Sequence, residues 1–200
     1  MAVVLRMWRG DGSWHAEAVQ LDLGEDRLSA TGTQFGADPL PYRVDYELET
    51  GANWVTRRLH VDAVGDGWSR SLELLSDEAG QWTCTSSVDG DVDLPVPGGN
   101  LAAVSGALDC DLAFSPLTNL MPVLRHDLHR QAGTVDFLMA WVSLPDLAVH
   151  ASPQRYEALG SDEKSALVRY IGLDNDFVAD LQLDTRGLVV HYPGIATRVS

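Results

Sequence analysis

Carboxylates and histidines are the residues of this sequence that could do acid–base chemistry. Asp109 and Asp111 lie two residues apart in an alternating stretch, so on a strand they share one face and one of them could have a raised pKa. His126 follows and could donate or accept a proton. Solvent-facing acids on strands are far more common than catalytic pairs, so these residues alone do not establish an active site.

Two further patterns suggest metal ions but are incomplete. The segment Asp89–Asp93 has carboxylates at the first, third and fifth positions of a calcium loop, yet Leu94 and Asn100 stand where that loop requires Gly and Glu. His126 and His129 would point to opposite faces of a strand, and no Cys or His cluster completes a set of ligands. We therefore expect a solvated acidic turn, two histidines at the surface or rim, and no metal or cofactor.

A possible nucleophile also lacks its partners. Ser161 and Lys164 match the Ser-x-x-Lys spacing of penicillin-recognising enzymes, but those enzymes also need a Lys-Thr-Gly motif, and Lys164 is the only lysine. The sequence contains no Gly-x-Ser-x-Gly elbow, P-loop or dinucleotide fingerprint. Ser161 is better explained as the cap of a short helix over 161–167, with acids in its first turn.

Composition limits the partners. The sequence has 29 Asp and Glu against 14 Lys and Arg, and its formal net charge of -15 would repel nucleic acid and anionic membrane surfaces. The apolar run at 1–8 is too short for a signal peptide and is broken by Arg6, and no later segment is long enough to span a membrane. We expect a cytoplasmic protein without membrane insertion, in which Cys84 and Cys110 are small core residues and not a disulfide.

Alternating hydrophobic residues predict the strands. The pattern is clearest in Tyr42–Leu48 and returns in Val55–Val61, where Arg57 interrupts it, and in Leu108–Phe114. Thr134–Val142 is apolar on both faces, which indicates a central strand. Short clusters containing Gly, Asp or Asn separate these runs at hairpin spacing. We therefore expect a curled antiparallel meander.

The remaining segments are short. Ser115–Leu120 has a capping serine and a proline at the first helical position, and Pro122 should end that helix early. The segment 87–106 is rich in Asp, Pro and Gly, so we expect a long surface loop inside a single domain that covers residues 1–200.

The stretch Leu108–Arg125 carries a resemblance. It reads LDCDLAFSPLTNLMPVLR and resembles the signature of a family of bacterial proteins described as putative glycolipid-binding, in which an Asp-x-Asp-Leu strand runs into a Pro-x-Thr-Asn-x-x-Pro turn and an arginine. Pieces before and after it agree in order, so the likeness spans nearly the whole chain. Leu120 and Leu124 depart from the pattern, replacing a threonine and the first arginine of a pair.

The resemblance implies a spiral β-roll or half-barrel, similar in shape to lipoprotein carriers whose curled sheet surrounds an apolar cavity. It implies non-catalytic binding of a lipid-like or glycolipid-like amphipathic molecule on the concave face, unless Phe137, Met139 and Trp141 fill that space. A small enzyme that uses Asp109, Asp111 or His126 and a protein-interaction module remain the alternatives, and the oligomeric state stays open. The resemblance places the candidate binding residues at one rim of the sheet: Thr118, Asn119, Arg125, Gln154, Tyr156 and Tyr192.

Overall fold

The structure is a computed structural model that describes residues 3–77 and 79–199. Its strands in chain order are β1 (Val3–Gly10), β2 (His15–Leu23), β3 (Leu28–Gly36), β4 (Tyr42–Thr50), β5 (Thr56–Gly65), β6 (Trp68–Ser76), β7 (Trp82–Gly90), β8 (Asp109–Leu112), β9 (Thr134–Val142), β10 (Val149–Ser161), β11 (Ser165–Gly172), β12 (Val178–Asp184), β13 (Val189–Tyr192) and β14 (Ala196–Arg198).

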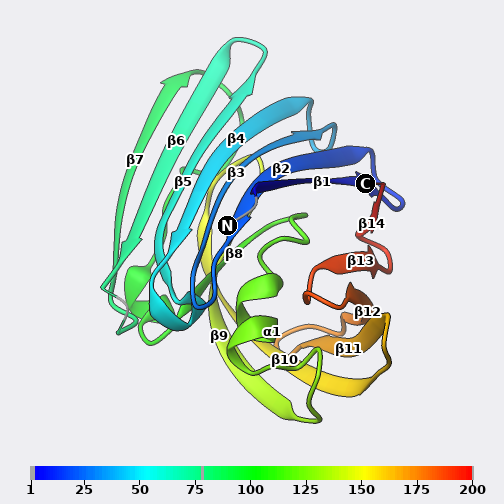
Figure 1. Ribbon diagram of the computed structural model, residues 1–200. Coiled ribbons are helices and arrows are strands. Elements are labelled where there is room, and N and C mark those ends of the chain that lie inside the picture. Colours follow the sequence, from blue (N-terminus) through cyan, green and yellow to red (C-terminus); the bar gives the residue numbers. More distant parts are fainter. Residues whose placement is uncertain (1–2, 78, 200) are drawn as a thin grey trace.

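Within these described residues, the fourteen strands form one sheet in the order β7-β6-β5-β4-β3-β2-β1-β14-β13-β12-β11-β10-β9-β8. The sheet curls, so that its two arms face each other across a concave interior (Figure 1). It is not closed, because β7 and β8 are its two edges. The predicted class, a single curled β-sheet with very few helical residues, is confirmed.

The first arm is an antiparallel meander of β1 to β7. As predicted, β4 buries one face, which carries Tyr42, Val44, Tyr46 and Leu48. Glycines on β3 make room for its tyrosines: the Tyr46 ring lies over Gly32 in the directly paired position, and the Tyr42 ring lies over Gly36. Aromatic rings that cover glycines on the neighbouring strand help to fix the pairing register.

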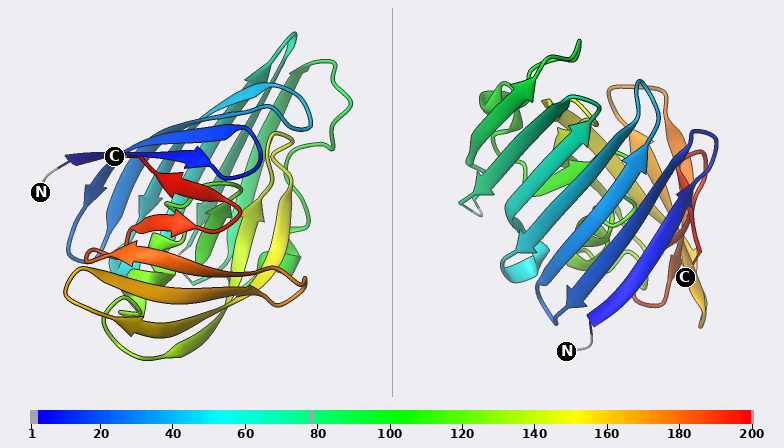
Figure 2. Two further views of the ribbon diagram at one scale, coloured as in Figure 1. Left: turned by 90° about the vertical axis from the view of Figure 1, so that its right-hand side faces the viewer. Right: turned by 90° about the horizontal axis from the view of Figure 1, so that it is seen from above.

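The second arm runs from β14 to β9 and joins the first arm where β1 pairs with β14 (Figure 2). At its edge, β8 pairs parallel to β9, in contrast to the antiparallel pairing of the other strand pairs described above. Parallel neighbours need a crossover connection, and the segment that contains the helix supplies it. The edge strand also reaches the start of β5, because the Thr56 amide donates to the Leu108 carbonyl at 3.0 Å. The chain thus spirals past its own first arm.

Helix α1 (Leu120–Arg125) lies inside the concavity (Figure 1). The predicted helix over Ser115–Leu120 is wrong, because Ser115 to Thr118 form turns and α1 begins only at Leu120. Pro122 sits within the first turn of α1, where its missing N–H costs no hydrogen bond. Val123 belongs to the same core cluster as Met139, so α1 fills part of the concave space.

Two further local predictions fail for identifiable reasons. The segment 161–167 is not a helix but the end of β10, a tight turn at 162–164 and the start of β11. Asp162 closes the turn, because its Oδ1 accepts hydrogen bonds from the Lys164 and Ser165 amides at 2.7 and 2.8 Å. The alternating pattern of Val55–Val61 would place Arg57 on the same face as Leu59, but Arg57 is exposed whereas Leu59 is buried. The pairing of β4 with β5 shifts there by one residue, which makes Arg57 the extra residue of a bulge.

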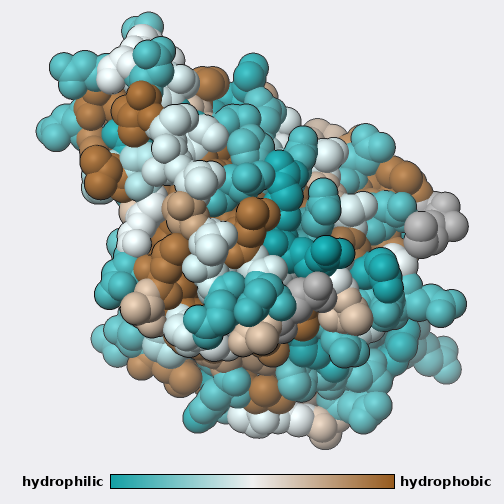
Figure 3. Space-filling model, turned by 90° about the vertical axis from the view of Figure 1, so that its left-hand side faces the viewer, coloured by the Kyte–Doolittle hydropathy of each residue, from teal (hydrophilic) through white to brown (hydrophobic). Residues whose placement is uncertain are grey.

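The segment after β7 covers one side of the roll. β7 extends through Gly90, so the first residues of the predicted loop at 87–106 are strand, and the 3-10 helix η2 (Leu101–Val104) buries Val104 completely. Arg70 is buried and donates to the carbonyls of Leu94 and Pro95, which fastens the segment to β6. Figure 3 shows this side, with hydrophobic residues in separate groups among polar ones.

The cysteines carry free thiols, with Cys110 buried and Cys84 half-buried. Among the described residues no helix is long and apolar enough to cross a membrane.

Candidate functional site

A cavity of about 830 Å³ opens on the concave face of the second arm. Its volume falls in the range of small-molecule sites, roughly 300 to 1,000 Å³. The walls come from β8 to β11, β13, the turn after β8 and the loop between β11 and β12. The residues that line it are Asp111, Leu112, Ala113, Phe114, Ser115, Asn119, Trp141, His150, Ala151, Ser152, Tyr170, Asp174, Asn175, Asp176, Phe177, Tyr192 and Ile195.

Strand pairing explains why side chains from three strands meet in the cavity. Asp111 is paired with Trp141 on β9, and Trp141 is paired with His150 on β10. Directly paired residues point to the same face of a sheet, here the concave one. The ring centroids of Trp141 and His150 are 5.6 Å apart. Trp141 therefore borders open space, whereas Met139, two residues earlier, is covered by α1.

Asp111 forms the polar floor. Its Oδ1 accepts from the Thr118 hydroxyl at 2.8 Å, and its Oδ2 accepts from Gln154 Nε2 at 2.8 Å. Burial raises the pKa of Asp111, while the hydrogen bonds from Gln154 and Thr118 act in the opposite direction. Each carboxylate oxygen can accept more than one hydrogen bond. The floor can therefore still accept hydroxyl groups from a ligand.

Asn119 stands beside this floor. Its Oδ1 accepts from the Tyr156 hydroxyl at 2.8 Å, and that bond fixes the orientation of the amide. Asn119 lines the cavity, and its amide nitrogen, which Tyr156 does not bind, remains available to donate a hydrogen bond. The floor thus offers a carboxylate acceptor and an amide donor, the combination that binds neighbouring hydroxyl groups.

Aromatic rings form a continuous wall above the floor. Tyr170 contacts Tyr156 edge to face, with ring centroids 5.6 Å apart, and contacts Phe177 at 5.8 Å and Tyr192 at 5.9 Å. Burial raises the pKa of Tyr156, Tyr170 and Tyr192 above the usual value, so these phenols stay neutral at physiological pH. The wall is apolar with hydroxyl groups at intervals.

The charge of the lining is negative. Asp111, Asp174 and Asp176 line the cavity, and no Arg or Lys does so in the described part of the chain. Such a cavity disfavours phosphate and carboxylate groups, because like charges repel most strongly where solvent is excluded.

Arg125 lies outside the cavity. Its Nη1 donates to Asp109 Oδ2 at 2.7 Å and its Nη2 to Asp109 Oδ1 at 2.5 Å. Its remaining bonds reach the carbonyls of Asn53 and Trp54 in the 3-10 turn η1 (Ala52–Trp54). Both terminal nitrogens of the guanidinium therefore bind the same carboxylate, that of Asp109. Burial raises the pKa of Asp109, and Arg125 opposes this rise. Through its hydrogen bonds to Asp109 and to the two carbonyls, Arg125 joins α1, β8 and η1.

Comparison with known proteins places the chain. A family model described as putative glycolipid-binding matches residues 5–198. The chain belongs to this family. It is also similar to the crystal structure of a DUF1089 family protein from Pseudomonas aeruginosa, with 30% sequence identity, a TM-score of 0.72, and 96% of this chain and 95% of that chain covered. A search of curated proteins gave no match.

The residues predicted from the family resemblance do not lie at a rim. Most of them are buried and surround the floor of the cavity, where Thr118 and Gln154 contact Asp111, Tyr156 contacts Asn119, and Tyr192 lines the wall. The crossover through α1 carries the turn with Thr118 and Asn119 into the concavity, which is why these residues are buried. Arg125 is the exception and lies with Asp109.

Several residues that line the cavity were not predicted from the sequence. Tyr170 and Phe177 come from β11 and the loop after it, and the sequence around them gave no signal of a shared site. Ser115 was interpreted only as a helix cap. Glu17 accepts a hydrogen bond from the Ser115 hydroxyl. It could have been predicted from the sequence as a carboxylate at an inward position of an alternating strand.

The histidines are also placed differently from the prediction. His126 follows α1 and packs on Phe137, with ring centroids 5.2 Å apart, and His129 is buried and not at the surface. Neither lies on a strand, so the argument from opposite strand faces does not apply.

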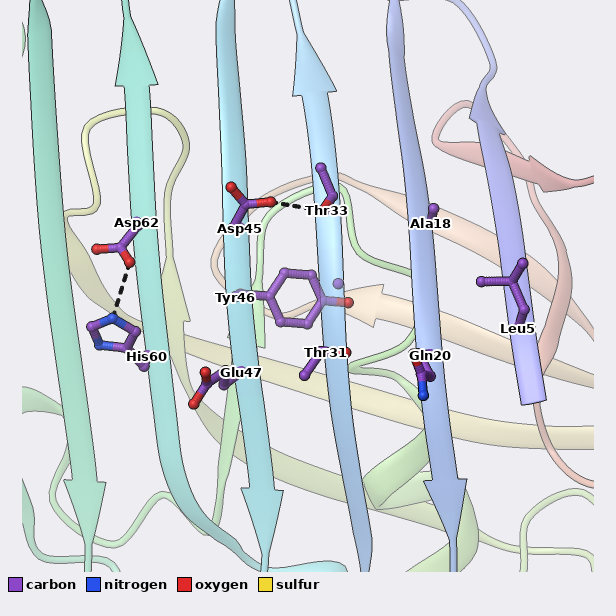
Figure 4. A pocket seen from close by; sticks show the side chains of 11 residues that line it. Leu5, Ala18, Gln20, Thr31, Thr33, Asp45, Tyr46, Glu47, His60 and Asp62 are labelled. Atoms are coloured by element: carbon purple, nitrogen blue, oxygen red, sulfur yellow. Dashed lines mark hydrogen bonds and ion pairs between the residues drawn. The ribbon is translucent and has the colours of Figure 1, made fainter. Parts of the chain in front are cut away.

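A shallower depression of about 360 Å³ lies on the convex side of β1 to β5. Figure 4 shows its polar side chains, of which Thr33 donates to Asp45 at 2.7 Å and His60 and Asp62 are joined at 3.1 Å. These groups already bind one another, and among the residues that line the depression only Tyr46 and His60 carry a ring. The concave cavity is the better candidate.

Proposed function

We propose that the protein binds a neutral amphipathic molecule of glycolipid type in the concave cavity, without transforming it. The observation that carries this proposal is the combination, in one cavity, of an aromatic wall with a floor that offers both an acceptor and a donor. The family description supports a binding role. The ligand class and the location are our inference.

We expect the head group of the ligand to be a neutral sugar or polyol. The floor pairs the Asp111 carboxylate with the Asn119 amide, and neighbouring hydroxyl groups can donate to the first and accept from the second. The faces of Trp141 and Tyr170 can cover the C–H face of a sugar ring. A phosphate head group would meet three carboxylates and no cation, so phospholipids should bind poorly.

The apolar part of the ligand would lie against Phe114, Leu112 and Ile195. Each methylene group that leaves water gains about 0.8 kcal/mol, so a short alkyl chain supplies most of the affinity and the floor supplies selectivity.

A catalytic role for the three groups considered from the sequence has less support. Asp109 is 1% exposed and both of its oxygens bind Arg125. His126 packs on Phe137 and does not line the cavity, so Asp111 is the only one of the three that a ligand there would touch. General acid–base catalysis needs groups within reach of the same reacting atoms.

Native mass spectrometry of gently purified protein tests the proposal by detecting a bound molecule. A titration with an alkyl glycoside and, separately, with a phosphatidylglycerol of matched chain length then tests the head group by intrinsic tryptophan fluorescence. We expect the glycoside to bind and the anionic lipid to bind at least tenfold more weakly.

Matched variants locate the site. Phe177 and Phe35 are both partly exposed, but only Phe177 lines the cavity. Phe177→Ala should weaken glycoside binding roughly tenfold, from lost apolar contact of about 1.5 kcal/mol, and Phe35→Ala should leave it unchanged. Equal affinity in both variants, or preference for the anionic lipid, would overturn the proposal.

A further inference from the structure

A second cleft of about 380 Å³ lies at the end of the roll where the turn between β2 and β3, η1, the segment after α1 and the turn between β12 and β13 meet. It shares no lining residue with the cavity. The residues that line it are Leu23, Gly24, Glu25, Trp54, Leu124, Asp127, His129, Arg130 and Arg186.

Two side chains in this cleft carry buried polar atoms without a partner. The His129 side chain is 3% exposed, and neither of its ring nitrogens makes a well-formed hydrogen bond, although the Val123 carbonyl is close enough to oppose the lowering of the His129 pKa by burial. The Asp127 carboxylate is 3.6 Å from Nδ1, which is too long for a hydrogen bond. Trp54 Nε1 is also buried without a partner. Buried groups of this kind are nearly always satisfied in folded proteins, by protein or by a bound molecule.

The cleft also differs from the cavity in charge. Arg186 is exposed, and its guanidinium makes no ion pair or hydrogen bond with any part of the chain that the structure describes. Arg130 is mostly exposed and lies 3.8 Å from Asp127. The Asp127 carboxylate also accepts a hydrogen bond from Gln131 Nε2 at 2.8 Å, so both Arg130 and Gln131 interact with its negative charge. Glu25 is the other acid in the lining.

The backbone around the cleft is held in a costly conformation. Asn53 and Trp54 both have φ of 55°, and Asp127 has φ of 51°, in the left-handed region that residues other than Gly rarely adopt. Arg125 binds the carbonyls of Asn53 and Trp54 and is itself anchored by Asp109. The Asp109–Arg125 pair therefore restrains the backbone of Trp54, which lines this cleft.

We propose that this cleft binds a small oxyanion, the carboxylate or phosphate group of a small molecule, between the Arg186 and Arg130 guanidinium groups and the N–H groups of Trp54 and His129. The indole nitrogen can only donate a hydrogen bond, and a neutral imidazole can donate one as well. Guanidinium groups match the paired oxygens of carboxylates and phosphates. The site is separate from the cavity, so it does not depend on the function proposed above.

The indole N–H signals in nitrogen–proton NMR spectra test the proposal on the full chain. Inorganic phosphate and, separately, acetate are titrated at low ionic strength, and the Trp54 signal is assigned by its loss in Trp54→Phe. We expect one or both anions to shift this signal with saturation, and added sodium chloride to weaken the effect. Saturation with phosphate alone would indicate a phosphate-bearing ligand, and saturation with acetate alone a carboxylate-bearing one.

Two variants with the same change in net charge separate a site from general attraction. Arg186→Gln should weaken the anion at least tenfold, whereas Arg43→Gln, which alters an exposed pair with Asp45 on β4, should not. Both residues are exposed, so both variants should melt like the parent. A Trp54 signal that neither anion moves, or equal weakening in the two variants, would overturn the proposal. Phe177→Ala should leave anion binding unchanged, so the two sites can fail independently.

Discussion

The Ser115 hydroxyl, in the wall of the cavity, donates a 2.5 Å hydrogen bond to Oε1 of Glu17 on β2. The same oxygen accepts from the Tyr46 hydroxyl at 2.7 Å and from Gln34 Nε2 at 3.3 Å, while Oε2 is buried without a partner. Burial raises the pKa of Glu17 to about 7, although the three hydrogen bonds lower it. One titratable group thus links the first arm of the sheet to the wall of the cavity.

This pKa predicts how stability depends on pH. In the unfolded chain Glu17 has an ordinary pKa near 4.5, so between about pH 4.5 and 7 the folded state holds the proton more tightly. The free energy of unfolding should therefore fall as the pH rises through this window, by roughly 3 kcal/mol from this group. Glu17→Gln keeps the shape without the charge and should remove this part of the pH dependence.

Urea unfolding at pH 5 and pH 8 measures the effect. The difference between the two pH values should shrink in Glu17→Gln and stay as in the parent in Glu49→Gln, whose side chain is exposed on β4. A Glu17→Gln variant with the parent's pH dependence would show that Glu17 titrates normally in the folded protein.

We expect Arg125 to stabilise the folded protein. Arg125→Ala leaves the buried Asp109 carboxylate without its partner, and breaking a buried pair in this way costs roughly 3 to 5 kcal/mol. Arg155→Ala breaks an exposed pair with Asp136 and should cost less than about 1 kcal/mol. Denaturant midpoints of the two variants and the parent make the comparison. An Arg125→Ala protein that unfolds like Arg155→Ala would mean that Asp109 is neutral or finds another donor.

The sequence predicted the curled sheet because its turns and its period-two runs are local signals. The helix expected at Ser161–Leu167 shows where local signals mislead: acids after a serine suit a helix start, but Asp162 can equally close a hairpin turn, and a helix of seven residues gains little by itself. The parallel pairing of β8 was not predictable, because it depends on where the crossover places α1.

The site was predictable in its residues more than in its geometry. A period of two shows that Asp109 and Asp111 share a face, but both faces of β8 are covered, with Cys110 buried on the other side. No sequence pattern shows which aspartate meets Arg125 and which meets the cavity, since that depends on the position of α1. The aromatic wall comes from strands far along the chain, which only the fold brings together.

The contact between Gly32 and Tyr46 predicts a sensitive glycine. A Cβ at position 32 would lie 2.3 to 2.5 Å from atoms of the Tyr46 ring, which reaches from β4 toward β3 in Figure 4. Tyr46 cannot move easily because its hydroxyl binds Glu17. Gly32→Ala should therefore cost roughly 1 to 3 kcal/mol by overpacking.

Gly133→Ala is the matched control, because Gly133 is exposed and its nearest contact would be Leu128 Cδ2 at 3.4 Å. Its free energy of unfolding should stay within about 0.5 kcal/mol of the parent value. Equal stabilities in the two variants, measured by urea unfolding, would show that the Tyr46 ring has room to shift.

We expect Asp111 to lower the stability of the folded protein and to contribute to ligand binding. Burial raises its pKa, which means that the folded protein disfavours the charged carboxylate that the floor of the cavity presents. Asp111→Asn removes the charge, and Thr118 and Gln154 can reorient toward the new amide, so the melting temperature should stay the same or rise. Affinity for an alkyl glycoside should fall by roughly 1.5 to 3 kcal/mol, the worth of a hydrogen bond to a charged acceptor.

Asp180→Asn is the control. It changes an exposed pair with Arg169 outside the cavity and should leave binding unchanged. If Asp111→Asn lowers the melting temperature and leaves the affinity unchanged, Asp111 is a structural residue. An unchanged or higher melting temperature with weaker binding is typical of a residue that contributes to ligand binding at a cost in stability.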